Sequence, residues 1–203
     1  MTKTQISIAT IFISLIVIVS CSKSDNTTTP VVVDPYAAIK AVFGTTIDPT
    51  SLENYTNQAR PAYLNPNKDN TGTNAITNTK ATIGRVLFYD KKLSSNNTIS
   101  CASCHQQANA FSDVAVASTG VNGTTERHAM RLINTRFSNE SKFFWDERAA
   151  SLEAQTTQPI RNHGEMGYSG TNGDQSFSDL ISKLSNIGYY KELFQYVYIC
   201  IFI

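Results

Sequence analysis

The stretch Cys101-Ala102-Ser103-Cys104-His105 decides how this chain is interpreted, because it gathers two thiols and an imidazole in one pentad. Two cysteines at this spacing reach the two vinyl groups on one edge of a haem and form thioether bonds. The histidine that follows supplies the proximal ligand of the iron. The sequence therefore predicts one covalently bound haem c, attached through Cys101 and Cys104 and ligated by His105.

A structural zinc site and a redox-active dithiol also use cysteines at this spacing. Zinc needs further ligands at a suitable spacing, but the remaining histidines, His128 and His163, are single and far apart in the sequence. A redox dithiol needs a strand-to-helix setting, which the polar residues 94–100 before the pentad do not provide. Covalent haem is therefore the favoured interpretation.

The N-terminal end has the layout of a bacterial lipoprotein signal peptide. An apolar run over residues 6–19 follows Lys3, ends in Ser20-Cys21 and is too short for a spanning helix. We expect residues 1–20 to be removed and Cys21 to be lipidated; an ordinary secretory signal with an incidental cysteine is the alternative. Residues 21–34 are largely polar and are expected to form a flexible tether. The chain is thus expected in the periplasm or cell envelope, held at the membrane by its lipid anchor.

Charge and cysteine content exclude two other classes of protein. The formal net charge is +1 at pH 7, and no basic stripe is present to neutralise phosphates, so a nucleic-acid partner is not expected. Of the four cysteines, one ends the signal peptide, two belong to the pentad and Cys200 stands alone, so they form no disulfide framework. A local basic group around Arg127 and Arg131 is usually a solvated face, but it can also receive haem propionates.

Helical periodicity surrounds the pentad. Ile83, Val86 and Leu87 predict a helix over residues 79–89. Ser100 is placed to cap a short helix that carries the haem motif. Further helices are expected over 127–136, over 149–157 with Pro159 as its stop, and over 177–184 with Phe177, Leu180, Ile181 and Leu184 on one face; loops are expected over 94–98 and 120–125. No alternating run is long enough for a sheet, so the predicted class is all-α, held around the haem.

A series of motifs on both sides of the pentad, taken in order, points to one family. They are residues 83–90 (Ile-Gly-Arg-Val-Leu-Phe-Tyr-Asp), 110–113 (Ala-Phe-Ser-Asp), 127–134 (Arg-His-Ala-Met-Arg-Leu-Ile-Asn), 144–149 (Phe-Trp-Asp-Glu-Arg-Ala), 151–155, 159–160 and 165–166. The chain resembles the di-haem bacterial cytochrome c peroxidases and their relative, the enzyme that matures methylamine dehydrogenase. The resemblance covers roughly residues 60–195.

This resemblance implies a fold, a reaction and partners. Members of the family have two cytochrome-c-like domains, each with its own haem, and this chain matches the first one, over residues 35–195. A second haem is expected in the full-length protein. The implied reaction is the reduction of hydrogen peroxide to water with electrons from a donor cytochrome or similar small protein, and a homodimer is compatible with it. Residues 196–203 are apolar, uncharged and β-prone, and we expect them to mark a truncated or frameshifted reading frame.

Site residues carry over by their place in these motifs. The resemblance implies that Gln155 and Glu165 form the polar pair on the peroxide-binding side. Trp145 resembles the aromatic residue between the two haems, a candidate electron relay, although a lone tryptophan is often only part of the core. Asn134 resembles a ligand of a calcium ion at the domain junction.

The chain departs from the family pattern at three places. Residues 120–123 contain no histidine where some members have a distal iron ligand, so an open iron is expected. Other candidates for a sixth ligand are His128, Met130, His163 and Met166. Glu147 stands where the family has glycine, and His163-Gly164 replaces the usual pair before Glu165.

Three other functions compete with peroxide reduction. A maturation oxidase would act on a protein substrate through the same haem pair. A one-haem electron carrier would need a strong sixth ligand to the iron. An inactive fragment is the third alternative.

Overall fold

The computed structural model describes residues 33–65 and 68–199. The predicted signal peptide, the lipidation site Cys21 and most of the predicted tether lie outside the described residues, as do Cys200 and residues 201–203. Within the described ranges, no helix combines the length and the apolar character that crossing a membrane requires.

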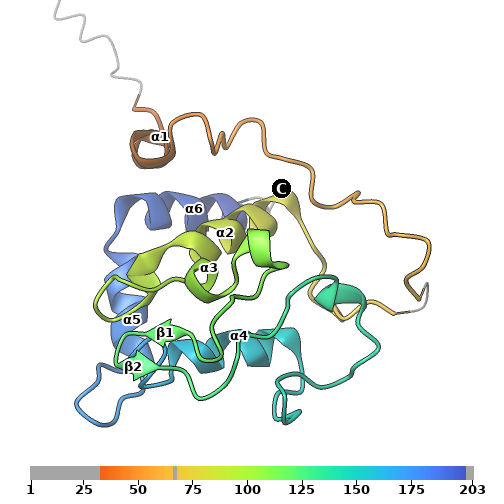
Figure 1. The fold of residues 1–203 in the computed structure, drawn as a ribbon. Coiled ribbons are helices and arrows are strands. Elements are labelled where there is room, and N and C mark those ends of the chain that lie inside the picture. Colours follow the sequence, from red (N-terminus) through yellow and green to blue (C-terminus); the bar gives the residue numbers. More distant parts are fainter. Residues whose placement is uncertain (1–32, 66–67, 200–203) are drawn as a thin grey trace, which may run out of the picture. The chain divides into compact units, whose positions relative to one another are not determined.

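The described residues form short helices joined by loops, with one very small hairpin (Figure 1). In chain order the elements are α1 (Ala37–Phe43), α2 (Asn78–Tyr89), η1 (Lys91–Leu93), α3 (Cys101–Cys104), η2 (Gln107–Asn109), β1 (Thr119–Gly120), β2 (Gly123–Thr124), η3 (Thr135–Phe137), α4 (Leu152–Ile160), α5 (Phe177–Ser185) and α6 (Gly188–Ile199). In the hairpin, Thr119 pairs with Thr124 and Gly120 with Gly123 in antiparallel register. The predicted helical class is therefore confirmed.

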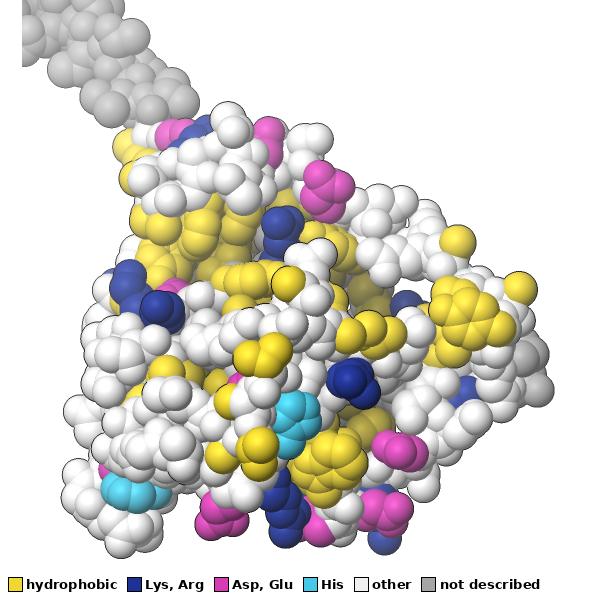
Figure 2. Space-filling model, in the orientation of Figure 1, with side chains coloured by type: hydrophobic (Ala, Val, Ile, Leu, Met, Phe, Trp, Pro, Cys, Tyr) yellow, Lys and Arg dark blue, Asp and Glu magenta, His cyan; other side chains and the backbone are white. Residues whose placement is uncertain are grey.

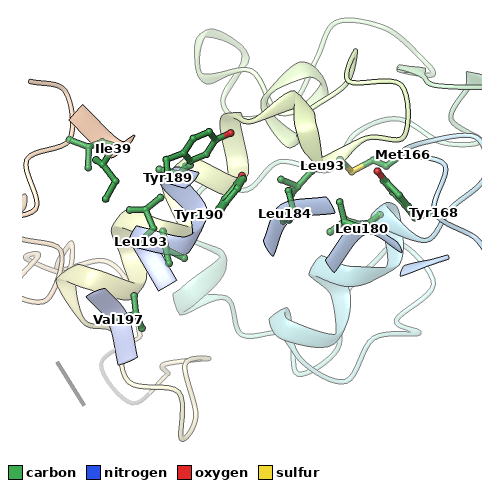
Figure 3. Close-up of a cluster of buried hydrophobic side chains, with 14 residues drawn as sticks. Ile39, Leu93, Met166, Tyr168, Leu180, Leu184, Tyr189, Tyr190, Leu193 and Val197 are labelled. Atoms are coloured by element: carbon green, nitrogen blue, oxygen red, sulfur yellow. The ribbon is translucent and has the colours of Figure 1, made fainter. Parts of the chain in front are cut away.

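Helix α6 organises the core, because it packs against α1, α2 and α5. Figure 3 shows its side chains at one end of a cluster that continues through Leu184 and Leu180 of α5 to Met166 and Tyr168. Tyr190 is completely buried, and its hydroxyl donates to the Asp90 carboxylate at 2.9 Å. Since Met166 belongs to this core, the backbone beside it is held firmly in place.

The C-terminal part of α6 differs from the β-prone end that the sequence predicted. Residues 196–199 continue the helix, and Val197 is buried in the core. Tyr196 packs edge-on against Tyr36, with ring centroids 5.7 Å apart. The carboxylate of Glu192 also accepts hydrogen bonds from the amides of Ala38 and Ile39, at 2.9 and 2.8 Å. Tertiary contacts with the start of α1 thus override the local preference for strand.

Two predicted helices are confirmed with small changes. Helix α2 starts one residue early, because the Thr77 hydroxyl accepts a hydrogen bond from the Lys80 amide at 3.2 Å and caps it. Helix α5 is capped by Ser176 and buries Leu180, whereas Ile181 is 52% exposed and does not belong to the buried face.

The helix predicted over 149–157 begins later and runs past its expected stop. Ala149 pairs with Phe143 across two backbone hydrogen bonds of 2.8 and 3.2 Å, so α4 starts only after Ser151, whose hydroxyl accepts from the Ala154 amide at 3.1 Å. Pro159 lies within the last turn of α4. It removes a single backbone hydrogen bond there, so the helix still reaches Ile160.

The prediction of a helix over 127–136 is wrong. Only η3 is helical in this stretch. Side chains from other segments occupy the carbonyls that such a helix would need: Thr125 donates to Arg127 at 2.8 Å, Ser112 to Ala129 at 2.5 Å and Trp145 to His128 at 3.2 Å. The segment is therefore held as an irregular strap beside the haem motif.

Candidate functional site

A cavity of about 420 Å³ lies beside α3. Its walls include the whole predicted haem motif (Cys101, Cys104 and His105) and four further predicted site residues, Arg127, Trp145, Gln155 and Glu165. These residues come from α3, from the strap after β2, from the turn before α4, from α4 and from the segment that follows it. The fold thus brings together side chains that are far apart in the sequence, in a volume within the usual range of ligand pockets.

The two thiols lie on a single turn of helix that is fixed at its start. Ser100 and Ser103 form a capping box at the start of α3, in which the Ser100 amide also donates to the Ser103 hydroxyl at 3.0 Å, so Ser100 caps this helix as predicted. Neither Cys101 nor Cys104 is in a disulfide. Burial raises the pKa of the Cys101 thiol to about 11 and also raises the pKa of Cys104. Both thiols are therefore poor thiolates at neutral pH, which is the opposite of what a redox dithiol needs.

His105 is oriented by a hydrogen bond to a carbonyl. Its Nδ1 lies 3.0 Å from the backbone oxygen of Phe111. Because a carbonyl oxygen can only accept, Nδ1 carries the proton and donates it. The other ring nitrogen, Nε2, is then unprotonated and available as a metal ligand.

A strained loop aims that carbonyl at His105. Ala110 and Phe111 both have positive φ, of 60° and 55°, which is uncommon for residues other than glycine. The loop closes where the Gln106 amide donates to the Ser112 carbonyl at 2.8 Å and the Phe111 amide donates to Gln106 at 2.9 Å. Strain of this kind persists only where surrounding contacts hold it, and it concentrates at functional sites.

Glu165 is half-buried in the cavity wall, on a segment that is clamped from both sides. Its amide donates a hydrogen bond to Asn162 Oδ1 at 3.0 Å, and its carbonyl accepts from the Val121 amide at 3.0 Å. The hairpin turn approaches so closely that a Cβ on Gly120 would lie 2.0 Å from the Gly164 carbonyl oxygen. Glycine at 120 is therefore required for the hairpin to reach this segment.

Burial raises the pKa of the Glu165 carboxyl, and the nearby charge of Glu126 raises it further, while Arg148 opposes both. Gln155 lines the same cavity from α4, but within the described residues no hydrogen bond joins it to Glu165. The positive charge that acts on Glu165 comes from Arg148, which belongs to the motif over 144–149 but was not among the predicted site residues.

Trp145 is not part of the core. Its side chain is 59% exposed, it lines the cavity, and its indole N–H donates to the His128 carbonyl at 3.2 Å. The neighbouring turn contains Glu147 with φ of 56°, and the Glu147 amide donates to Phe144 at 3.1 Å. Glycine adopts this left-handed conformation more readily than other residues, and the turn forms here with glutamate.

Arginines of this turn and of the strap share one carboxylate. Asp146 accepts from Arg127 at 3.0 Å and from Arg148 at 2.8 Å, and the Arg148 guanidinium lies 3.6 Å from the centroid of the Phe144 ring. Figure 2 shows acidic and basic side chains next to each other along the lower edge of this face.

Two predicted site residues, Arg131 and Asn134, are exposed and do not line the cavity. Among the described residues, no group of three or more His, Cys, Asp or Glu side chains is arranged to hold a metal ion.

The candidate sixth ligands separate into two groups. His163 does not line the cavity, and its Nδ1 lies 3.0 Å from Asp174. His128 lines it, but both of its ring nitrogens have hydrogen-bond partners. The thioethers Met130 and Met166 also line the cavity, and Met166 is only 3% exposed.

Comparisons with known proteins agree on one family. The family model described as di-haem cytochrome c peroxidase matches residues 78–199. The methylamine utilization protein MauG of Methylophilus methylotrophus is 31% identical over 123 residues, which are 60% of this chain and 34% of that relative. Cytochrome c peroxidase Ccp of Escherichia coli is 35% identical over 120 residues, 59% of this chain and 24% of that relative. Among solved structures, a MauG-like protein associated with microbial copper homeostasis matches with a TM-score of 0.56 and 31% sequence identity. The match covers 68% of this chain and 39% of that protein's chain. The chain thus matches about a third or less of the length of these two curated relatives.

Proposed function

The chain belongs to the di-haem cytochrome c peroxidase family, and from this premise we propose that it is a haem c peroxidase, which reduces hydrogen peroxide to water with electrons from a donor cytochrome or similar protein. One observation carries the proposal: the haem pentad and the carboxylate of Glu165, about sixty residues apart in the sequence, line the same cavity. Several curated relatives are named cytochrome c peroxidases.

The donor set around the cavity fits a covalently attached haem. Cys101 and Cys104 would form the thioethers, and His105 would ligate the iron through Nε2, which the hydrogen bond from Nδ1 to Phe111 leaves free. When bound, the haem supplies the redox-active iron at which peroxide is reduced. We assign Arg127 to the rim of this site, as a candidate partner of the propionates.

Glu165 is proposed to move the proton. Reduction of one peroxide molecule consumes two electrons and two protons and gives two waters. The Glu165 carboxylate accepts a proton at Oε from one peroxide oxygen and returns it to the other, which leaves as water. The raised pKa suits this double role, because a carboxyl group nearer to the working pH both accepts and donates protons readily. Gln155, also in the cavity wall, orients the peroxide, and Trp145 serves as the electron relay.

The remaining assignments follow from the sequence. We propose that residues 1–20 are a signal peptide, that Cys21 carries a lipid, and that the haem domain at 35–195 works in the periplasm or cell envelope. The donor protein, a second haem, a calcium ion near Asn134 and a homodimer belong to the same proposal.

One relative favours a second function. MauG of Methylophilus methylotrophus is named a methylamine utilization protein, so a maturation oxidase that acts on a protein substrate is the alternative within the family. A one-haem electron carrier is the alternative outside enzymes, and Met130 and Met166 are the side chains placed to support it.

The direct test uses the full chain, expressed in an exporting host with a haem c maturation system. The reduced protein is mixed with hydrogen peroxide in a stopped-flow spectrometer. We expect rapid oxidation of the haem and a ferric spectrum of the high-spin type, since we expect no protein side chain as sixth ligand. A haem that peroxide does not oxidise, with a low-spin spectrum that Met166→Ala or Met130→Ala abolishes, would overturn the peroxidase proposal in favour of an electron carrier.

A further inference from the structure

His128 has no part in the proposed reaction, yet its side chain and backbone join three parts of the site. Its Nδ1 lies 2.7 Å from the Ala115 carbonyl, and its Nε2 lies 3.0 Å from the Ser112 hydroxyl. The backbone carbonyl of His128 accepts from the indole of Trp145 at 3.2 Å. His128 itself forms part of the cavity wall.

The contacts of this ring fix its position. The Ala115 carbonyl can only accept, so Nδ1 donates to it. Nε2 lies within hydrogen-bonding distance of the Ser112 hydroxyl, which also donates to the Ala129 carbonyl at 2.5 Å. The Ser112 side chain is therefore held from two sides by the segment that contains His128 and Ala129.

A nearly buried carboxylate lies beside the ring. Asp113 Oδ1 lies 3.7 Å from Nδ1 of His128, and the Asp113 side chain is 7% exposed. Its oxygens also accept from the Ala115 amide at 3.0 Å and from the Ser118 hydroxyl at 2.5 Å. A polar network with this many hydrogen bonds is well placed to hold its members in one geometry.

Among the residues that His128 contacts, Ser112 links it to the proposed iron ligand, because Ser112 directly follows Phe111 in the chain. The Phe111 carbonyl orients His105, and the Ser112 carbonyl closes the strained loop by accepting from Gln106 at 2.8 Å. The Ser112 side chain is buried, and its polar contacts go to His128 and to the Ala129 backbone. His128 therefore holds, through Ser112, the loop that aims the carbonyl at His105.

We propose that His128 is a positioning residue for the haem: its ring, beside Asp113, holds Ser112 and thereby fixes the hydrogen bond from His105 to Phe111. This inference rests on the proposed haem site. It predicts that loss of the His128 ring loosens the orientation of His105, and so changes the bond between His105 and the iron, without removing the haem.

The test measures the iron–histidine stretching band of the reduced holoprotein by resonance Raman spectroscopy, together with the haem midpoint potential. We expect His128→Ala and Ser112→Ala each to shift and broaden the band and to shift the potential, with haem content unchanged. Because both act on one contact, the double variant should shift no further than either single variant. His128→Gln keeps one donor and much of the side-chain volume, so it should restore part of the band.

The matched control is His163→Ala, because His163 pairs with Asp174 outside the cavity and should leave the band unchanged. Additive shifts in the double variant, or a His128→Ala band identical to that of the unsubstituted protein together with an unchanged potential, would overturn the proposal. Unsubstituted protein that carries no covalent haem would instead overturn the haem site on which the inference depends.

Discussion

The two sides of the cavity are built in different ways. The haem-attachment side comes from one continuous stretch: the thiols, His105 and the Phe111 carbonyl that orients it all lie within residues 101–111. The side that carries Glu165 is assembled at long range, by the hairpin turn at Gly120 and by a core that reaches Met166. The proposed attachment of the haem is thus encoded by local spacing, whereas the orientation of the proposed acid–base group depends on tertiary packing.

The largest effect should come from the locally encoded side. Replacing both Cys101 and Cys104 with alanine removes the only thiols that line the cavity within the described residues, so covalent haem should be lost completely. Haem staining after denaturing gel electrophoresis measures this, with Gly84→Ala, on the exposed face of α2, as a control that should retain the stain. Covalent haem in the doubly substituted protein would show that Cys101 and Cys104 do not attach it, and the contrast between the two sides of the cavity would then fail.

The second effect isolates the side assembled at long range. Glu165→Gln keeps the size of the side chain but cannot accept a proton, and general acid–base help is typically worth about 10²–10⁴-fold. The reaction of the reduced haem with peroxide should slow by roughly that factor, with the haem stain unchanged. Gln155→Ala should cost less, since Gln155 orients rather than transfers. Stopped-flow rates give the ranking, and an unchanged rate for Glu165→Gln would exclude Glu165 from the mechanism.

A third change acts on the packing that aims Glu165. In Gly120→Ala the new Cβ would lie 2.0 Å from the Gly164 carbonyl oxygen, so the hairpin or the Glu165 segment must move. Overpacking of this kind costs about 1–3 kcal/mol of unfolding free energy, and the peroxide rate should fall by less than in Glu165→Gln. Denaturant unfolding and stopped-flow mixing measure the two effects. Gly84→Ala is the matched control, because a Cβ there meets nothing within 4 Å. Equal rates in the two variants would mean that the hairpin does not aim Glu165.

The smallest effect concerns stability and pH. The folded-state pKa of Glu165 is raised by burial, so ionisation of this carboxyl in the folded protein opposes folding at neutral pH. Glu165→Gln should therefore unfold at higher denaturant concentration than the unsubstituted protein at pH 7. The difference should vanish as the pH falls through the raised pKa and Glu165 becomes protonated. Urea unfolding at a series of pH values measures this, and a difference that grows toward low pH would contradict the stated cause.

The same contrast explains what could be predicted from the sequence. The capped turn at Ser100, helix α2 and helix α5 depend on near neighbours, and their patterns predicted them well. The strap over 127–136 was misread because side chains from Ser112 and Trp145, distant in sequence, occupy its carbonyls. Arg148 was not among the predicted site residues, and His128 was considered only as a sixth ligand, for a related reason. The charge of Arg148 acts on Glu165 and the ring of His128 meets Ser112 across long stretches of sequence, which no local spacing records.

Trp145 is an intrinsic fluorescence probe of the cavity. It is the single tryptophan of the chain, and its indole lies in the cavity wall with its N–H bonded to the strap. A haem absorbs strongly where tryptophan emits, so a haem in this cavity should quench nearly all of that emission. Fluorescence of an intact sample would then report the fraction of molecules without cofactor, and its wavelength would report whether the indole still meets water. One measurement on unlabelled protein would therefore report both the fraction of molecules that hold haem and the exposure of Trp145 to water.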